Sequence, residues 1–498
     1  MSRTFKTFFN KFNKFSKLYK NFKKNAKIFC EVILLKNFPG CVIIVLYIEK
    51  SGKNQKIKER QPNKFMELAI LAENIKNGAY NEKLKTLYGD NKIEPAKERY
   101  IKAVENFCSL YGNRDIEIIS VPGRSEILGN HTDHNHGCVL AAAINLDVIA
   151  IVSKSLVPGG RKSHIRIQSE GFAPDDVDID DIKNLAPVEG EKFTSAAIIR
   201  GTCARFAELG YEIGGFDAYT VSDVLKGSGL SSSAAFEILV GFILNHLYNE
   251  NKISPLEIAQ IGQYAENNYF GKPCGLMDQT ACSVGGFVAI DFENPAEPVV
   301  EKLDFDLTKS GYSLCIVAPG GSHDNLNQEY ADIKNEMQKV ASYFGKSVLR
   351  DVEKAEFNAN IDKIKNLCGD RAVLRAMHYF AENIRVRAGA ETLKDGNFEG
   401  FLLLITSSGN SSFKYLQNIY VAKEPNIQGI SLALALSEEI LANKQAAVRV
   451  HGGGFAGTIQ AFIPKRLVGE YFEKIKPVFG EDSCLELFVR NDGAVVVM

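Results

Sequence analysis

The segment LKGSGLSSSAAFEILVGFILNHLY, residues 225–248, constrains the fold of this chain most strongly. Gly227 and Gly229 permit a close backbone approach, and three serines follow them. From about Ser233 the apolar residues recur at helical spacing, so we expect a helix to begin there. The free N–H groups and the dipole of a helix N-terminus attract an anion. The segment therefore predicts a phosphate-binding loop that leads into a helix.

A plain helix cap is the simpler interpretation of this loop, since serine is a favoured N-cap residue. A cap accounts for one serine, but it leaves the two glycines and the other two serines unexplained. The hydroxyls of Ser232 and Ser233 can in addition meet a phosphate or a magnesium ion. The Walker pattern G-x-x-x-x-G-K-[ST] is absent, so the predicted loop is of another type.

A second segment, HTDHNH at residues 131–136, places three of the chain's eight histidines and one aspartate within six residues. Imidazole nitrogens and carboxylates bind zinc and similar ions, so a metal site is one interpretation. In an extended segment, however, side chains alternate between faces, which separates His131 and Asp133 from the other two histidines. Because a loop can still gather all four side chains, the residues alone leave a metal site open.

Two further segments hold residues that suit a binding or catalytic site. In VRVHGGGFAGTIQAFIP, Gly452 to Gly454 separate two strand-like runs, which is typical of a tight turn or of backbone packed against a ligand. In AENNYFGKPCGLMDQTACSVGG, the carboxylate of Asp278 is expected to be buried, and it follows Glu266 by twelve positions. A lone buried aspartate is more often a structural hydrogen-bond acceptor. Beside a phosphate loop, one carboxylate can hold Mg²⁺ while the other receives a hydroxyl proton.

Charge is distributed unevenly along the chain. Residues 1–65 carry 16 Lys+Arg against 3 Asp+Glu, which leaves 43 against 57 for residues 66–498. An acidic body argues against nucleic-acid binding, because that function needs a positive surface. The ten cysteines are scattered and include no C-x-x-C pair, as is usual in a reducing cytosol. We therefore expect a cytoplasmic protein without a nucleic-acid partner.

The basic head of the chain, MSRTFKTFFNKFNKFSKLYKNFKKNAK, is nearly all Phe, Lys and Asn. The apolar runs after it are split by KNFPG at residues 36–40, so each is well short of the roughly 20 residues that cross a bilayer. No A-x-A cleavage site follows, which argues against a signal peptide. A membrane-surface helix is one interpretation. We expect instead that residues 1–65 are an extension outside the folded core, which begins near Met66.

The segments together resemble the galactokinases, within the GHMP superfamily of small-molecule kinases. The galactokinase signature reads P-G-R-x-N-x-x-G-E-H-T-D-Y-N-x-G, and residues 122–137 read PGRSEILGNHTDHNHG. The phosphate loop, the C-G-L-M-D-Q run around Asp278, and the runs QEYADIKNEM and RAMHYFAENIRVRAG follow in the family's order. The resemblance covers the chain from about residue 120 to its C-terminus. It implies that HTDHNH is a sugar-binding loop and not a metal site.

The resemblance also implies a role for each residue that matches a family motif. The catalytic aspartate and the arginine that stabilises charge at the transferring phosphoryl group match Asp278 and Arg124. The sugar-contacting residues match Asn130, His131, Thr132, Asp133 and Tyr330. The ATP phosphate loop matches Gly227, Ser228, Gly229, Leu230, Ser231, Ser232 and Ser233. The magnesium ligands match Ser233 and Glu266.

Several positions depart from the galactokinase pattern. The family's Asn and Glu are Glu126 and Asn130 here, its Tyr is His134, and a loop proline is absent at residues 225–226. The change at Asn130 matters most, because the family's carboxylate there is understood to receive a sugar hydroxyl, that on C6. An amide still donates and accepts hydrogen bonds, which suits a neutral hexose. The loss of the charge would also tolerate a C6 carboxylate, as in galacturonate.

The resemblance implies an enzyme that uses ATP and Mg²⁺ to phosphorylate the anomeric hydroxyl of galactose. A kinase of a related sugar such as galacturonate is one alternative, and a kinase-like sugar sensor without turnover is another. The presence of Arg124, Asp278 and the loop through Ser233 favours the enzyme. A metallohydrolase would need ligands beyond HTDHNH, and the other five histidines are far away in the sequence.

We expect an α+β architecture with two domains, as in GHMP kinases, and a site in the cleft between them. Residues 66–295 would hold the sugar signature and the phosphate loop, and residues 296–498 would contribute the Gly452–Gly454 turn. Sugar and ATP are the expected partners, with no membrane contact and a monomeric state.

Overall fold

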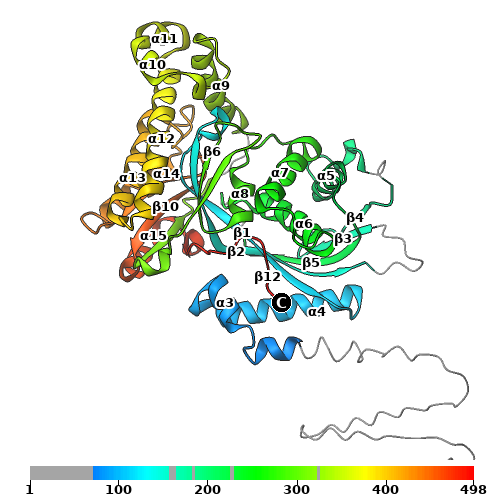
Figure 1. Cartoon of the computed structure of the whole chain (residues 1–498). Coiled ribbons are helices and arrows are strands. Elements are labelled where there is room, and N and C mark those ends of the chain that lie inside the picture. The colour runs from blue at the N-terminus through cyan, green and yellow to red at the C-terminus, as the bar shows by residue number, and fades with distance from the viewer. Residues whose placement is uncertain (1–70, 156–163, 182–184, 225–228, 322–325) are drawn as a thin grey trace, which may run out of the picture. The chain divides into compact units, whose positions relative to one another are not determined.

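The computed structural model of the chain describes part of its sequence, shown in colour in Figure 1. The described residues are 71–498, apart from 156–163, 182–184, 225–228 and 322–325. These described residues belong to one compact unit. The expectations for residues 1–65, and the ATP contacts predicted for Gly227 and Ser228, lie outside the described residues.

A large sheet holds the first part of the described chain. It consists of eight strands: β1 (Glu117–Leu128), β2 (Cys138–Lys154), β3 (His164–Ser169), β4 (Asp175–Asp178), β5 (Phe216–Ser222), β6 (Phe287–Asp291), β7 (Val299–Leu303) and β12 (Val495–Val496). The order is β12-β1-β2-β5-β3-β4, and β6 pairs with β2 and β7. Neighbouring strands are antiparallel except for β3 with β5. Because β12 pairs with β1, the C-terminus returns to the first strand (Figure 1).

The second sheet has four strands: β8 (Tyr312–Val317), β9 (Ala447–His451), β10 (Thr458–Pro464) and β11 (Cys484–Leu487). Their order is β11-β8-β10-β9, and every pair is antiparallel. The α-helices are α3 (Asn81–Tyr88), α4 (Ile93–Tyr111), α5 (Ser195–Glu208), α6 (Ser232–Tyr248), α7 (Pro255–Ala265), α8 (Met277–Val284), α9 (Asn327–Tyr343), α10 (Lys354–Ala359), α11 (Ile361–Cys368), α12 (Asp370–Lys394), α13 (Phe398–Ser411), α14 (Gly429–Ile440) and α15 (Val468–Phe479).

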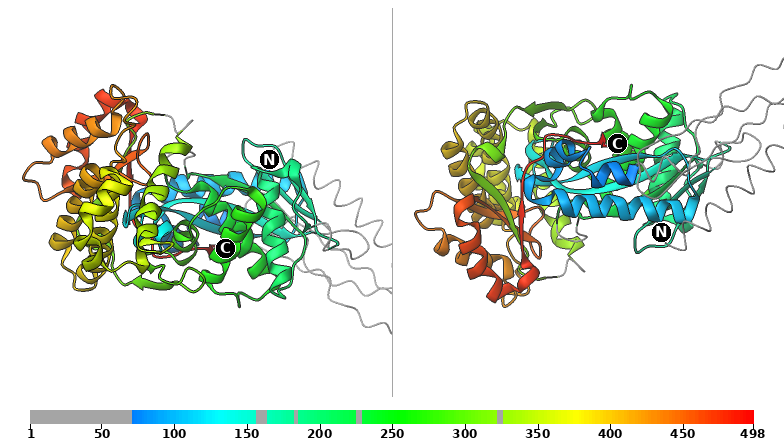
Figure 2. Two further views of the ribbon diagram at one scale, coloured as in Figure 1. Left: turned by 90° about the horizontal axis from the view of Figure 1, so that it is seen from above. Right: turned by 90° about the horizontal axis from the view of Figure 1, so that it is seen from below.

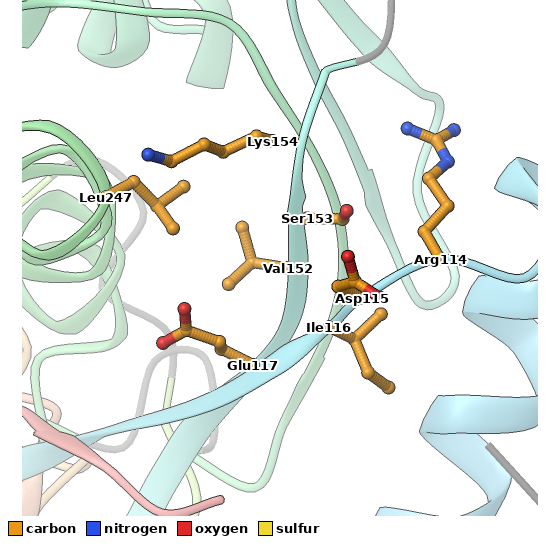
Figure 3. Close-up of a pocket in the computed structure, with 8 residues that line it drawn as sticks. All are labelled: Arg114, Asp115, Ile116, Glu117, Val152, Ser153, Lys154 and Leu247. Atoms are coloured by element: carbon orange, nitrogen blue, oxygen red, sulfur yellow. The ribbon is translucent and has the colours of Figure 1, made fainter. Parts of the chain in front are cut away.

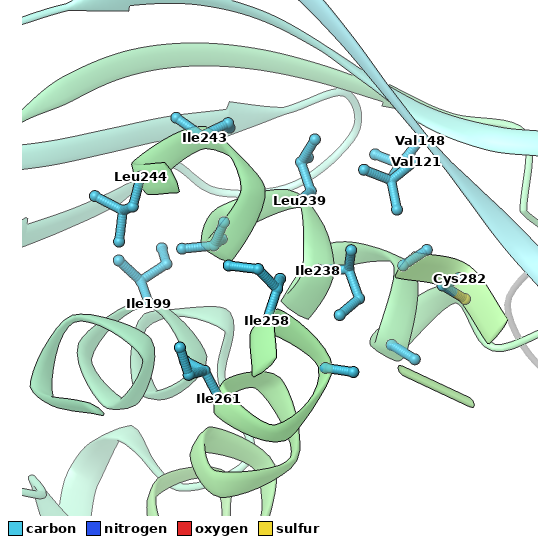
Figure 4. Close-up of a cluster of buried hydrophobic side chains, with 14 of the residues drawn as sticks. Val121, Val148, Ile199, Ile238, Leu239, Ile243, Leu244, Ile258, Ile261 and Cys282 are labelled. Carbon is cyan, nitrogen blue, oxygen red and sulfur yellow. The ribbon is translucent and has the colours of Figure 1, made fainter. Parts of the chain in front are cut away.

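The large sheet is covered on both faces, which explains why β2 is apolar almost throughout. Successive side chains of a strand point to opposite faces. Val148, Ala150 and Val152 accordingly pack against the layer of α5 to α8, whereas Ile149 and Ile151 pack against α3 and α4. Figure 4 shows the first of these cores, in which Ile238 and Leu239 of α6 face strands β1 and β2. Each such buried aliphatic side chain stabilises the fold by about 1.5–3 kcal/mol.

The second sheet is built on the same alternation. Leu314 and Ile316 of β8 pack with α12 and α13, whereas Cys315 and Val317 pack with α14 and α15. Figure 2 shows α12 and α13 side by side in yellow and orange, with the red C-terminal elements next to them. Two sheets with helices on their faces confirm the predicted α+β class.

The predicted local elements around the key motifs are confirmed. The helix expected from about Ser233 is α6, which begins at Ser232. The two strands expected around the glycine turn are β9 and β10. The boundary between domains near residues 295–296 remains a prediction. No described helix is both long enough and apolar enough to cross a membrane.

Removal of residues 1–65 is expected to leave kcat almost unchanged and to shift Tm by no more than about 2 °C. The reason is the abrupt change of composition at Met66 together with a described core that already includes Ile75, with Leu71 partly buried against it. The measurement compares thermal melts and turnover of the full chain and of a chain that begins at Met66. A truncated protein that is insoluble or inactive would show that the extension stabilises the body.

Candidate active site

The predicted catalytic residues Arg124 and Asp278 form an ion pair, although 154 positions separate them. Arg124 lies on β1 beside a register shift, and its Nε donates to Oδ1 of Asp278 at 2.8 Å. Its Nη2 lies 2.7 Å from the same oxygen. The hydroxyl of Ser231 bonds to the other carboxylate oxygen, and Arg124 Nη1 donates to the carbonyl of Gly229. The pair is thereby joined to the end of the predicted phosphate loop.

Arg124 is nearly buried, whereas Asp278 stays accessible. The side chain of Arg124 is 8% exposed, and burial alone would lower its pKa, but the charge of Asp278 raises it overall. The side chain of Asp278 is 31% exposed, so the expectation of a buried carboxylate is wrong. Asp278 lies in the first turn of α8, where the backbone dipole favours a negative charge. The site thus presents a positioned carboxylate that a substrate can reach.

The described part of the phosphate loop leaves the start of α6 open to an anion. Ser231 precedes the helix with a left-handed backbone (φ 60°), and its side chain makes no capping hydrogen bond. Its hydroxyl bonds to Asp278 instead, so this serine does not act as a plain helix cap. Leu230 is fully buried and anchors the turn, while Ser233 is exposed on the first helical turn. These features suit a phosphate group at the N–H groups of α6.

The predicted sugar loop meets the glycine turn between β9 and β10. The ring Nε2 of His131 lies 3.0 Å from the carbonyl oxygen of Gly453, and Tyr330 donates its hydroxyl to the carbonyl of Gly454 at 3.2 Å. The rings of His131 and Tyr330 are stacked with centroids 6.4 Å apart. A Cβ on Gly453 would lie 2.7 Å from the ring of Tyr330, which explains why glycine is needed there. Residues from three distant segments are therefore joined at this loop.

Asp133 connects the sugar loop with the segment before α8. Its carboxylate lies against Gly275, where a Cβ would overlap an oxygen of Asp133. Burial raises the pKa of Asp133, while the nearby charge of His131 opposes the rise. The charge of Asp278 also acts on this carboxyl group. The sugar loop and the Arg124–Asp278 pair are thus close enough to share one electrostatic environment.

Thr132 and Asn130 differ from the other predicted sugar contacts, because both side chains are enclosed by protein. Thr132 is fully buried, and its hydroxyl lies within donating distance of two carbonyl oxygens, that of Cys138 at 2.7 Å and that of Gly129 at 2.9 Å. This hydroxyl therefore stabilises the loop itself. Asn130 is 1% exposed.

The proposed magnesium ligand Glu266 belongs to a buried carboxylate pair that sequence reasoning missed. Gln279 Nε2 donates to Glu266 Oε2 at 3.1 Å and to Glu237 Oε2 at 2.9 Å. Burial, and then the charge of Glu266, raise the pKa of Glu237 well above its usual value. One signal was available in the sequence: Glu237 is the charged residue within the apolar run AAFEILVGFIL. A charge at that position of a buried helix indicates a partner inside the protein.

The donor set around Glu266 fits Mg²⁺. Glu266 is 3% exposed and lies beside a second carboxylate, while Lys272 Nζ is 3.6 Å away. Burial favours the neutral form of Glu237, so the carboxylate oxygens of Glu266 are the ones suited to a cation, and Lys272 is their present charged partner. Magnesium binds through one or two protein oxygens plus waters and substrate phosphates. Ser233 and Glu266 offer oxygens of this type, and their role as magnesium ligands remains a prediction.

The side chains of HTDHNH have separate polar partners, although the rings of His131 and His134 lie 5.8 Å apart. His131 contacts Gly453, Asp133 faces Gly275, and His134 Nδ1 bonds to the side chain of Asn135 at 2.9 Å. Among the residues that the structure describes, no group of three or more His, Cys, Asp or Glu side chains is arranged to hold a metal ion.

An open cavity of about 320 Å³ lies away from these residues, at the other end of β1 (Figure 3). Its lining includes Glu117, Val152, Lys154 and Leu247, and it contains none of the predicted site residues. Glu117 is bonded there to His246. The cavity therefore adds nothing to the candidate active site.

Comparison with known proteins identifies the family of the chain. Residues 197–286 match the family model of the GHMP kinases N terminal domain, and residues 105–154 match the galactokinase galactose-binding signature. A galactokinase of Glaesserella parasuis is 32% identical over 400 residues, which cover 78% of this chain and 96% of the relative. The chain belongs to the galactokinase family. A galactokinase of Actinobacillus pleuropneumoniae, 30% identical over 386 residues, covers 75% of this chain and is itself covered to 93%.

Solved structures confirm the GHMP kinase fold of this galactokinase family member. The Lactococcus lactis galactokinase complexed with galactose matches with a TM-score of 0.65 at 22% identity, covering 78% of this chain and 98% of that one. A mevalonate kinase matches with a TM-score of 0.52 at 17% identity, covering 75% and 99%. The resemblance to galactokinases inferred from four motifs is therefore confirmed over most of the described chain.

Proposed function

We propose that this member of the galactokinase family transfers the γ-phosphoryl group of ATP to the anomeric C1 hydroxyl of galactose, forming galactose 1-phosphate. The observation that carries the proposal is the contact of the Arg124–Asp278 pair with the phosphate loop through Gly229 and Ser231. A hydroxyl acceptor next to Asp278 would lie beside a phosphate held at the start of α6. Phosphoryl transfer needs this juxtaposition of acceptor and donor.

Asp278 is proposed to orient the C1 hydroxyl and to receive its proton as the oxygen attacks. Its ion pair with Arg124 and its bond to Ser231 hold the carboxylate in one position, which is what a general base requires. The guanidinium of Arg124 supplies positive charge where negative charge develops on the transferring group. The hydrogen bond from Arg124 Nη1 to the carbonyl oxygen of Gly229 keeps the guanidinium beside the loop.

ATP is proposed to bind with its phosphates over the loop that ends in Ser233. Mg²⁺, when bound, would neutralise negative charge on the phosphates. Ser233 and Glu266 are the residues proposed to hold the ion. The sugar is proposed to lie against His131, Asp133 and Tyr330, whose polar atoms are at the loop that joins the glycine turn. Several fixed polar partners are what discriminate one sugar hydroxyl pattern from another.

A panel of sugars tests the proposed function. ADP release is measured with galactose, glucose and galacturonate, and the phosphorylated position is assigned by NMR. Galactose 1-phosphate is the expected product, with galactose giving the highest kcat/KM. A preference for galacturonate would establish the related sugar kinase instead. Sugar binding by calorimetry without ADP release would establish a sensor.

A further inference from the structure

The side-chain amide of Asn130 is fully occupied by protein partners. Its Nδ2 donates to Oε1 of Glu126 at 2.9 Å and to the carbonyl of Gly452 at 2.7 Å. Its Oδ1 accepts from Nδ2 of Asn418 at 2.7 Å and from the hydroxyl of Ser412 at 3.4 Å. An amide offers two donor hydrogens and an acceptor oxygen with two lone pairs, so these contacts use its whole capacity. The side chain fixes the sugar loop to the glycine turn.

Glu126 is the partner that favours an amide at position 130. It is 6% exposed, and its Oε1 also lies 3.4 Å from Nη2 of the fully buried Arg449. Arg449 acts on a second buried carboxylate as well, Glu382, which is paired with Arg385 at 2.7 Å. Arg124 also acts on Glu126, but its own ion-pair partner is Asp278. A third carboxylate would therefore have to share guanidinium groups that already have carboxylate partners.

A carboxylate at position 130 would therefore conflict with Glu126. The atom that replaces Nδ2 would be an oxygen facing Oε1 of Glu126 and the carbonyl of Gly452, at positions now 2.9 and 2.7 Å away. Acceptors that face one another without a proton are repulsive, and burial strengthens the repulsion. The Asn of the galactokinase pattern stands where this chain has Glu126, and the pattern's Glu stands where it has Asn130. The two departures are in direct contact.

We propose that Glu126 and Asn130 form one coupled positioning pair for the sugar loop. A carboxylate is tolerated at position 130 only when position 126 has no carboxylate. The negative charge that the galactokinase pattern has at position 130 is then not missing from this protein. It lies on Glu126, next to the loop, and acts on Asp133. This favours a neutral hexose over a sugar with a C6 carboxylate. The preference for a neutral hexose rests on the proposed function, whereas the coupling between positions 126 and 130 does not.

The test is a double-mutant cycle with substitutions that keep side-chain shape: Asn130→Asp and Glu126→Gln, singly and together. Asn130→Asp alone is expected to raise the KM for galactose by about 30-fold and to lower Tm, because it buries an unpaired carboxylate. The KM for ATP should stay within about threefold, since the pair touches the sugar loop and not the phosphate loop. In the Glu126→Gln background the same change should raise the KM for galactose about tenfold less, because an amide N–H then faces the new carboxylate.

A matched control is Asn135→Asp, measured in the wild-type background and in the Glu126→Gln background. Asn135 is also a fully buried asparagine of this loop, but its Oδ1 accepts from the backbone of Leu349 at 3.1 Å. The effect of Asn135→Asp on the KM for galactose and on Tm should be the same in both backgrounds. The proposal is overturned if Asn130→Asp changes KM and Tm by the same amounts with and without Glu126→Gln. It is also overturned if Glu126→Gln reduces the effect of Asn135→Asp by an equal factor. If the wild type does not phosphorylate galactose, the proposed function fails, while the Tm values of the cycle still test the pair.

Discussion

Replacement of Asp278 by Asn is expected to lower kcat by about 10²–10⁴-fold while galactose still binds. Asparagine has nearly the same shape, but its amide cannot take a proton from the sugar hydroxyl. It also ends the charge pairing of the nearly buried Arg124, which otherwise lies 2.7 Å from a carboxylate oxygen. The measurement is kcat from ADP release, with sugar binding followed separately by calorimetry. A variant that keeps more than about a tenth of the wild-type kcat would make Asp278 a structural residue.

Asp291→Asn is the matched control for this prediction. Asp291 is also an arginine-paired aspartate, with Arg350 Nη2 at 3.0 Å, and its side chain is 26% exposed against 31% for Asp278. It lies on β6 and pairs with Arg350 and Arg387, neither of which belongs to the proposed site. Asp278→Asn loses the ion pair with Arg124, and Asp291→Asn loses those with Arg350 and the exposed Arg387, so the Tm of both variants should fall. A loss of kcat confined to Asp278→Asn separates catalysis from pairing.

Local segments of the sequence predicted the elements that carry the site. Glycines and serines followed by apolar residues at helical spacing predicted a loop and a helix, and α6 begins one residue before the expected position. The signature around HTDHNH implied a sugar-binding loop. The structure shows a loop there that connects His131 with Tyr330 and the glycine turn, and its contacts with a sugar remain a prediction. These predictions succeed because each depends on neighbouring residues and on backbone geometry.

Contacts between distant residues could not be predicted in the same way. In the sequence, Asn130 looks like a free amide that replaces a sugar-binding carboxylate. Its partners Asn418 and Gly452 are 288 and 322 positions away, and only the folded chain shows that the amide is enclosed. The bridge that Gln279 makes between Glu237 and Glu266 was missed for the same reason. Hydrogen-bond saturation is a property of the packed interior, not of a motif.

Removal of divalent cations is expected to abolish phosphoryl transfer, and Mg²⁺ is expected to restore it. A cation is needed to neutralise the charge of the phosphates, and the proposed protein ligands are the oxygens of Ser233 and Glu266. Chelation that removes zinc but leaves Mg²⁺ free should have no effect. Stoichiometric zinc in the purified protein, lost together with activity on chelation, would instead support a metal site at HTDHNH.

Glu266→Gln should raise the Mg²⁺ concentration for half-maximal activity by at least about tenfold, because a neutral amide is a weaker ligand for this ion. The same change should raise Tm or leave it unchanged, since it removes one of two buried carboxyl groups bridged by Gln279. Glu237→Gln is the control, because it relieves the same crowding and leaves the proposed ligand in place. Its Mg²⁺ requirement should stay within about threefold of wild type. Equal changes in both variants would mean that Glu266 serves the fold and that the ion binds elsewhere.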